Sequence, residues 1–146
     1  SVAGRIGENM EKRKVNIQLQ ENLPLFRLDY GLMDEILQTL LLNAALNIPA
    51  GAEISIGASY RGHKMVLVVE DTGPGFPPGE IEKVFEKFYR LKSSKPGGTG
   101  LGLSIVKGFV EAQQGIIRLE NKKEGGAKFT IEIPAEISHL DSLRNG

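Results

Sequence analysis

The spacing of hydrophobic residues along the chain first separates strands from helices. Apolar and polar residues alternate in the stretch 15–19, which is typical of a strand. Other short apolar runs, bounded by glycine, proline or charged residues, predict further strands at 25–28, 54–60, 65–69, 116–120 and 128–133. Residues 61–64 separate two of these runs closely enough to predict a hairpin.

Longer stretches repeat their apolar residues at spacings of three and four, which predicts helices. The first runs over 30–47, where Asp29 can cap its start. One stripe of this helix combines apolar and amide side chains: Leu32, Ile36, Leu40, Asn43 and Asn47. A second long helix is predicted at 101–114, and a short one at 79–86.

These elements predict an α+β two-layer sandwich. Its sheet is mixed, mainly antiparallel and built from about five strands, with about three helices on one face. The other face should be more polar, because Gln18, Ser55, Arg118 and Glu132 alternate outward. We expect one domain at 15–134, preceded by the end of an upstream helical or linker segment at 1–14 and followed by a loose tail at 135–146.

The amino-acid composition argues against several kinds of binding site and catalytic group. The 146 residues suffice for one domain, and 18 basic residues balance 18 acidic ones, which argues against binding to nucleic acid. The chain has no cysteine, so disulfides, zinc–thiolate sites and thiol nucleophiles are excluded. It has no apolar run long enough to span a membrane, and it begins without methionine, which suggests a fragment of a longer protein.

Two glycine-rich segments, at 71–76 and 97–105, carry the candidate chemistry. Glycine is costly in regular structure, so such density indicates tight turns or close approach to a ligand. Asp71, at the end of an apolar strand, can accept a hydrogen bond from an exocyclic amine, which would select adenine over guanine. Gly73 and Gly75 would let the backbone lie against the base. The alternative is an ordinary turn at the end of a strand.

The second segment places Gly98, Gly100 and Gly102 before a helix, whose N-terminal amides suit phosphate. It lacks the Gly-Lys-Ser/Thr of a P-loop, and a flexible linker is the alternative. Asn43, in mid-helix, could ligate Mg²⁺ or be a satisfied core asparagine. Arg90 could stabilise a transferring phosphoryl group, or belong to a solvated basic face.

Together these segments resemble the ATP-binding catalytic domain of bacterial sensor histidine kinases, a branch of the GHKL superfamily. The general character of the sequence, including the stretch 105–112, is similar to the potassium- and osmosensing kinases. The matching motifs stand in the family's order. They are the N box at 41–44, the first glycine box at 71–75, the F box at 85–90, the second glycine box at 98–103 and the closing strand at 125–134.

The resemblance implies a Bergerat fold that binds ATP and Mg²⁺ between the long helix, the sheet and a lid at 87–99. It implies catalytic roles for Arg90 and Asn43, with Asn43 holding the metal. The residues that it implies around the nucleotide are Asn43, Asn47, Asp71, Gly73, Gly75, Phe76, Phe88, Tyr89, Arg90, Gly98, Thr99, Gly100, Leu101, Gly102 and Leu103.

By the same resemblance, the chain would transfer the γ-phosphoryl group of ATP to a histidine on an upstream dimerisation domain of the same protein. The implied partners are that domain, a second copy in a homodimer and a response regulator. The implied location is the cytoplasmic part of a membrane-anchored kinase. Neither His63, in a predicted hairpin turn, nor His139, in the tail, has the sequence context of a phosphoacceptor.

The chain departs from the family in the N box. At position 39 the kinases usually have an asparagine and the ATP-hydrolysing relatives a glutamate, but this chain has Thr39. At position 46 the family usually has a lysine, but this chain has Leu46. Threonine cannot act as a general base at neutral pH. One alternative is therefore a nucleotide-binding regulatory module with weak or no kinase activity. Another is a stand-alone serine kinase of the anti-sigma type, against which the F box and the second glycine box argue.

Overall fold

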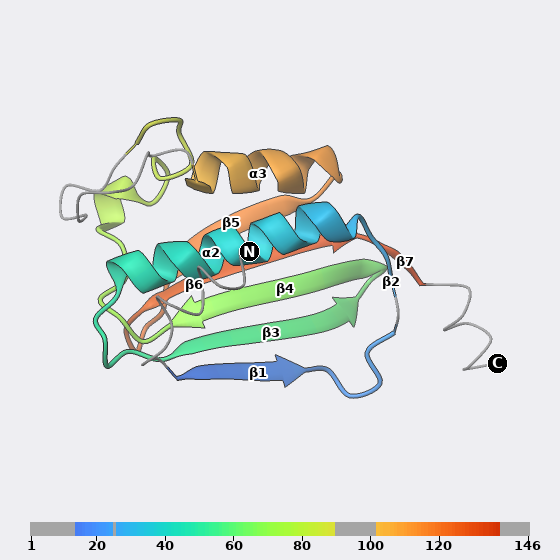
Figure 1. Cartoon of the computed structure of the whole chain (residues 1–146), viewed down its shortest axis with the longest axis horizontal. Helices are drawn as coiled ribbons and strands as arrows, with labels where there is room; N and C mark the ends of the chain where they lie inside the picture. Colours follow the sequence, from blue (N-terminus) through green and yellow to red (C-terminus); the bar gives the residue numbers. More distant parts are fainter. Residues whose placement is uncertain (1–13, 25, 90–101, 138–146) are drawn as a thin grey trace.

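A computed structural model describes residues 14–24, 26–89 and 102–137 (Figure 1). Its strands are β1 (Val15–Leu19), β2 (Phe26–Arg27), β3 (Ile54–Arg61), β4 (Lys64–Asp71), β5 (Ile116–Asn121), β6 (Ala127–Pro134) and β7 (Glu136–Ile137). Its helices are α2 (Tyr30–Asn47), the short 3₁₀ helix η1 (Pro78–Glu80) and α3 (Gly102–Ala112).

Five strands form the main sheet in the order β1-β3-β4-β6-β5. β1 runs parallel to β3, and the other neighbours are antiparallel. The two hairpins, β3–β4 and β5–β6, lie side by side because β4 pairs with β6. The expected mixed, mainly antiparallel sheet is thereby confirmed, and so is the α+β sandwich.

The helices α2 and α3 lie next to each other across one face of this sheet (Figure 1). Apolar side chains from both layers are fully buried between them: Ile36, Leu40, Ile54, Val106, Val110, Ile131 and Ile133. On the polar face Arg118 and Glu132 form the ion pair that neighbouring strands allow, with 3.5 Å between their charged atoms. No helix in the described residues is both long and apolar enough to cross a membrane.

Helix α2 has the bounds that its hydrophobic pattern predicts. The Asp29 side chain accepts a hydrogen bond from the Leu32 amide at 3.1 Å, so it is the expected cap. The helix ends when Ile48 becomes extended, just before Pro49, because the residue before a proline disfavours helical geometry. This ending places the last turn of α2 beside the end of β4.

The short helix expected at 79–86 is wrong in type. Only residues 78–80 form a helix, and it is a 3₁₀ turn followed by further turns. Hydrogen bonds of the i to i+3 kind, from Glu80 to Pro77, Lys83 to Glu80 and Glu86 to Lys83, dominate there. Side chains of this segment pack onto the core: Val84 is buried, and Phe85 meets the Phe129 ring.

A second, two-stranded sheet joins β2 to β7. The strand expected at 25–28 therefore exists, but only over two residues. Its partner lies at 136–137, in the segment expected to be a loose tail. Residues 1–13 and 138–146 lie outside the described residues.

Candidate functional site

A cavity of about 110 Å³ opens where the C-terminal part of α2 meets the end of β4. Its wall combines the last turns of α2, the end of β4, the glycine loop 72–77 and the start of β6. The lining residues are Leu40, Asn43, Ala44, Leu46, Asn47, Ile48, Val69, Glu70, Asp71, Pro74, Gly75, Phe76, Pro77, Ala127 and Phe129.

Asp71 is the last residue of β4 and is only 8% exposed. Its Oδ1 atom accepts hydrogen bonds from the amides of Gly73 at 2.8 Å and Ala127 at 3.3 Å. These are the contacts that the carboxylate makes with the described residues, and both end on Oδ1. The second oxygen, Oδ2, therefore has its hydrogen-bonding capacity left for a ligand.

The loop after Asp71 is held so closely that its glycines have no room for a side chain. A Cβ at Gly73 would lie 2.9 Å from Cγ2 of Ile48. Gly75 has a φ of +77°, and its Cβ would lie 2.6 Å from Oδ1 of Asn121. The loop is thus enclosed between the end of α2 and the end of β5, which fixes the backbone that faces the cavity.

The α2 side of the cavity carries the two predicted asparagines. Asn47 donates from Nδ2 to the Asn43 carbonyl at 2.8 Å, which orients its amide along the helix. The amide of Asn43 forms no side-chain hydrogen bond with the described residues. The structure therefore brings five of the residues that the resemblance implies around a nucleotide to the wall of one cavity: Asn43, Asn47, Asp71, Gly75 and Phe76.

Phe76 forms part of the core as well as of the wall. It is buried and meets the Phe129 ring edge-on, with 5.9 Å between ring centroids. Phe85 packs against the same Phe129 ring in a similar way at 6.4 Å. Phe85, the first residue of the F box, therefore packs against the core.

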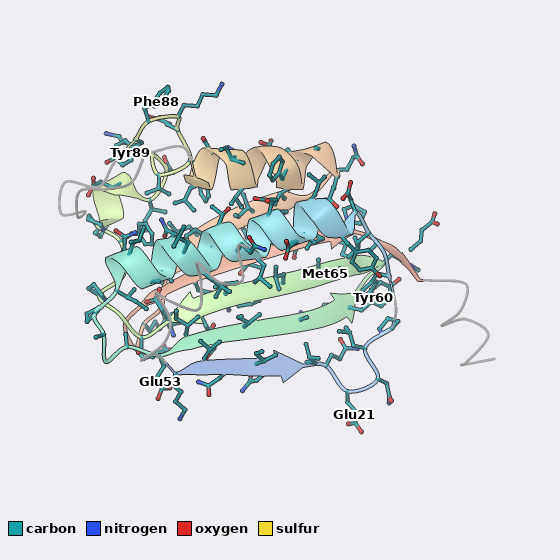
Figure 2. All side chains as sticks on the ribbon, in the orientation of Figure 1. Glu21, Glu53, Tyr60, Met65, Phe88 and Tyr89 are labelled. Atoms are coloured by element: carbon teal, nitrogen blue, oxygen red, sulfur yellow. The ribbon has the colours of Figure 1, made fainter. Side chains whose placement is uncertain are left out.

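Phe88 and Tyr89 do not line the cavity. Figure 2 shows both on the segment that follows η1. Phe88 is 69% exposed and has a φ of +64°, which is unusual for a residue with a bulky side chain. The Tyr89 hydroxyl donates a hydrogen bond to Glu80 on η1. This bond, with smaller contributions from desolvation and nearby carboxylates, raises the pKa of Tyr89 to about 12.

Gly102 and Leu103 open α3. Gly102 lies against α2, because a Cβ there would come within 3.2 Å of Cγ2 of Thr39. The Leu103 side chain is buried in the core, so only its backbone is left to face a ligand. Arg90, Gly98, Thr99, Gly100 and Leu101, and most of the lid expected at 87–99, lie outside the described residues.

The sequence interpretation missed two contributions from the β5–β6 hairpin. Asn121 bridges to the backbone of Phe76, and Lys122 pairs with Glu70 of the cavity wall at 3.8 Å. Both contacts arise because strand pairing brings together residues that are far apart in the sequence. The spacing of residues along the chain does not predict such contacts. Within the described residues no cluster of three or more acidic or histidine side chains could hold a metal by itself.

Comparisons with known proteins agree with this geometry. Residues 29–137 match the family described as "Histidine kinase-, DNA gyrase B-, and HSP90-like ATPase". The sensor protein KdpD of Escherichia coli is 41% identical over 123 residues, covering 84% of this chain and 14% of KdpD. The sensor-like histidine kinase SenX3 of Mycolicibacterium smegmatis is 38% identical over 109 residues, covering 73% of this chain and 28% of SenX3.

Solved structures extend the match to the fold. The mycobacterial sensor histidine kinase MprB superposes with a TM-score of 0.80 at 26% identity, covering 94% of this chain and 93% of that one. Full-length ShkA, solved in complex with AMPPNP, gives a TM-score of 0.77 at 26% identity over 94% of this chain and 30% of ShkA. The chain thus spans a small part of its full-length relatives. It belongs to the histidine kinase-, DNA gyrase B- and HSP90-like ATPase family and is homologous to sensor histidine kinases.

Proposed function

We propose that this chain is the ATP-binding catalytic domain of a sensor histidine kinase. In this proposal it transfers the γ-phosphoryl group of Mg-ATP to a histidine on a separate dimerisation domain. The observation that carries the proposal is the buried Asp71 carboxylate, oriented through Oδ1 by two backbone amides beside a glycine loop. A fixed acceptor of this kind suits the amino group of adenine.

The size of the cavity supports a base rather than a whole nucleotide in the described part of the site. Its volume of about 110 Å³ is small beside the roughly 300–1,000 Å³ of pockets that enclose drug-sized ligands. The apolar side chains of Val69 and Phe76 and the backbone of Gly75 suit a flat ring. The sugar and phosphates would then extend out of this cavity.

Asn43 supports the metal half of the proposal. Its amide lies at the cavity and makes no side-chain hydrogen bond to described residues, so its oxygen fits a Mg²⁺ ion. Mg²⁺ keeps several waters and takes one or two protein oxygens beside phosphates, so an acidic cluster is not required. When bound, the ion would neutralise phosphate charge, and Asn43 would position it. Arg90 and the residues 98–103 would complete the phosphate site.

The histidine that receives the phosphoryl group would come from outside this domain. Asp71 pairs with Ile54 at one end of the β3–β4 hairpin, and His63 lies in the turn at the other end. Eight residues of strand separate them, about 26 Å at roughly 3.3 Å per residue. Figure 2 shows Glu53 and Tyr60 at the two opposite ends of β3. His63 therefore suits a contact with the Tyr60 hydroxyl, at 3.3 Å, rather than catalysis.

The names of the relatives support the wider setting. We infer an upstream dimerisation domain, a homodimeric full-length protein, a response regulator as the next phosphoryl acceptor and a membrane-anchored sensor in which this domain is cytoplasmic. The support is that two relatives are named as the sensor-like histidine kinase SenX3 and the sensor histidine kinase MprB.

One observation favours the alternative of a regulatory module with weak kinase activity. Leu46 lines the cavity and is 41% exposed, so an apolar group stands where a charged one could meet a phosphate. The two functions differ in one product. We expect the full-length protein, incubated with Mg²⁺ and γ-labelled ATP, to form acid-labile phosphohistidine. ATP binding without any phosphohistidine would favour the regulatory module.

A further inference from the structure

We propose that Asn121 is a positioning residue that holds the glycine loop 72–77 in the conformation that receives the base. This inference deepens the proposed function and depends on it. Asn121 is the last residue of β5 and does not line the cavity. Its effect on a nucleotide must therefore pass through the loop.

The contact is a pair of hydrogen bonds to one residue of the loop. The Phe76 amide donates to Oδ1 of Asn121 at 2.9 Å, and Nδ2 of Asn121 donates to the Phe76 carbonyl at 2.8 Å. The side chain thus satisfies both polar backbone groups of a buried residue 45 positions away. Only a carboxamide of this length offers one donor and one acceptor in that arrangement. Aspartate could keep the first bond and would lose the second.

The hairpin that carries Asn121 is itself fixed to the other end of the loop. Ala127, the β6 partner of Asn121, donates its amide to Asp71 Oδ1 at 3.3 Å. Gly126 has a φ of +96°, and a Cβ there would lie 1.9 Å from the Asp71 carbonyl oxygen. One hairpin therefore contacts both Asp71, where the loop begins, and Phe76, near its end.

A salt bridge at the same place strengthens this attachment. Lys122 lies next to Asn121, and its ammonium group is 3.8 Å from the carboxylate of Glu70, which precedes Asp71. The Lys122 side chain is 12% exposed, so this pair is better shielded from water than a surface pair. The Lys122 amide also closes the β5–β6 turn onto the Gly126 carbonyl at 2.9 Å.

This arrangement predicts an effect on binding that differs from an effect on stability. Asn121 is exposed, so its truncation opens no cavity in the core. Without the two bonds the loop would have to be ordered when the ligand binds, and that cost would lower affinity. Because the loop faces the base, the loss should be equal for ATP, ADP and adenosine. In the full-length kinase it should raise KM and leave kcat unchanged.

The test measures the affinity of this chain for ATP, ADP and adenosine by calorimetry. We expect Asn121→Ala to raise all three Kd values about tenfold, the size of two neutral hydrogen bonds returned to water. Asn121→Asp should raise them less, because it keeps the bond from the Phe76 amide. Gln18→Ala, which removes another exposed carboxamide from the same sheet, should leave them unchanged.

Amide hydrogen exchange provides the second measurement and does not require a ligand. Exchange at Phe76 should accelerate in Asn121→Ala while the amides of β3 and β4 stay protected. Wild-type affinity in Asn121→Ala, or unchanged exchange at Phe76, would overturn the inference and leave the proposed function standing. Absence of adenine-nucleotide binding by the wild type would instead refute the proposed function.

Discussion

The sheet side and the helix side of the cavity differ in how their polar groups are held. On the sheet side two backbone amides hold Asp71, and the loop after it is tied to β5. On the helix side the Asn43 amide makes no side-chain bond to described residues, and Leu46 is substantially exposed. A rigid side suits a flat base of fixed shape, and an adaptable side suits phosphates and a hydrated ion.

The largest effect is expected from a substitution on the rigid side, where the β5–β6 turn contacts Asp71. Gly126→Ala would place a Cβ 1.9 Å from the Asp71 carbonyl at a φ of +96°, so we expect a loss of about 3 kcal/mol in the free energy of unfolding. Gly125→Ala is the matched control. It has a similar φ of +103° but no atom within 4 Å of its Cβ, and should cost only about 1–2 kcal/mol. Urea unfolding measures both, and equal losses would show that the contact with Asp71 is unimportant.

A second variant adds charge to the adaptable side. Leu46→Lys would place a cation at the rim of the cavity, and we expect the Kd for ATP to fall about threefold to tenfold. The gain should shrink as salt is added, because the new charge is exposed. Leu46→Met keeps a similar length without charge and should bind like the wild type. A gain that is equal for ATP and adenosine would argue against a phosphate at this place.

The smallest expected effect lies outside the cavity, at Tyr89. Its hydrogen bond to Glu80 needs the phenolic proton, and the pKa of Tyr89 is raised from 10.0 to about 12. A raised pKa means that the stability from this bond is complete below about pH 10 and is lost as the pH rises towards 12.

We therefore expect Tyr89→Phe to lower the Tm slightly at pH 8, and this difference to shrink as the pH rises from about 10 towards 12. Affinity for adenosine should not change, because Tyr89 does not line the cavity proposed to take the base. Thermal unfolding between pH 8 and 12 checks the first point, and a Tm difference that grows with pH would contradict it. Calorimetry at pH 7.5 checks the second.

Sequence patterns correctly predicted the features of the fold that are set by residues close together in the chain. The stripe from Leu32 to Asn47 predicted α2 with its observed ends, and Asp29 was identified as its cap. Asp71 was predicted at the end of a strand because a buried apolar run precedes it directly. Each of these signals lies within one turn or one strand of the feature that it predicts.

The remaining features depend on contacts between distant segments. The pairing of β2 with β7 joins residues more than a hundred positions apart. The bridge from Asn121 to Phe76 joins one hairpin to a loop that follows another. The expected helix at 79–86 was wrong: the backbone there forms mainly i to i+3 bonds, while Val84 is buried and Phe85 packs against the distant Phe129 ring. Tertiary contacts decide such features, and local spacing does not encode them.

The role that we propose for Asp71 is to select adenine through its Oδ2 atom, which makes no hydrogen bond with the described residues. Calorimetry of this chain with ATP and GTP tests it directly, using Asp71→Asn and, as a nearby control, Glu53→Gln. We expect the wild type and Glu53→Gln to bind ATP and to discriminate against GTP. Asp71→Asn should lose at least about 100-fold in ATP affinity with an unchanged circular dichroism spectrum. If Asp71→Asn bound ATP as tightly as the wild type, Asp71 would not be the residue that recognises adenine.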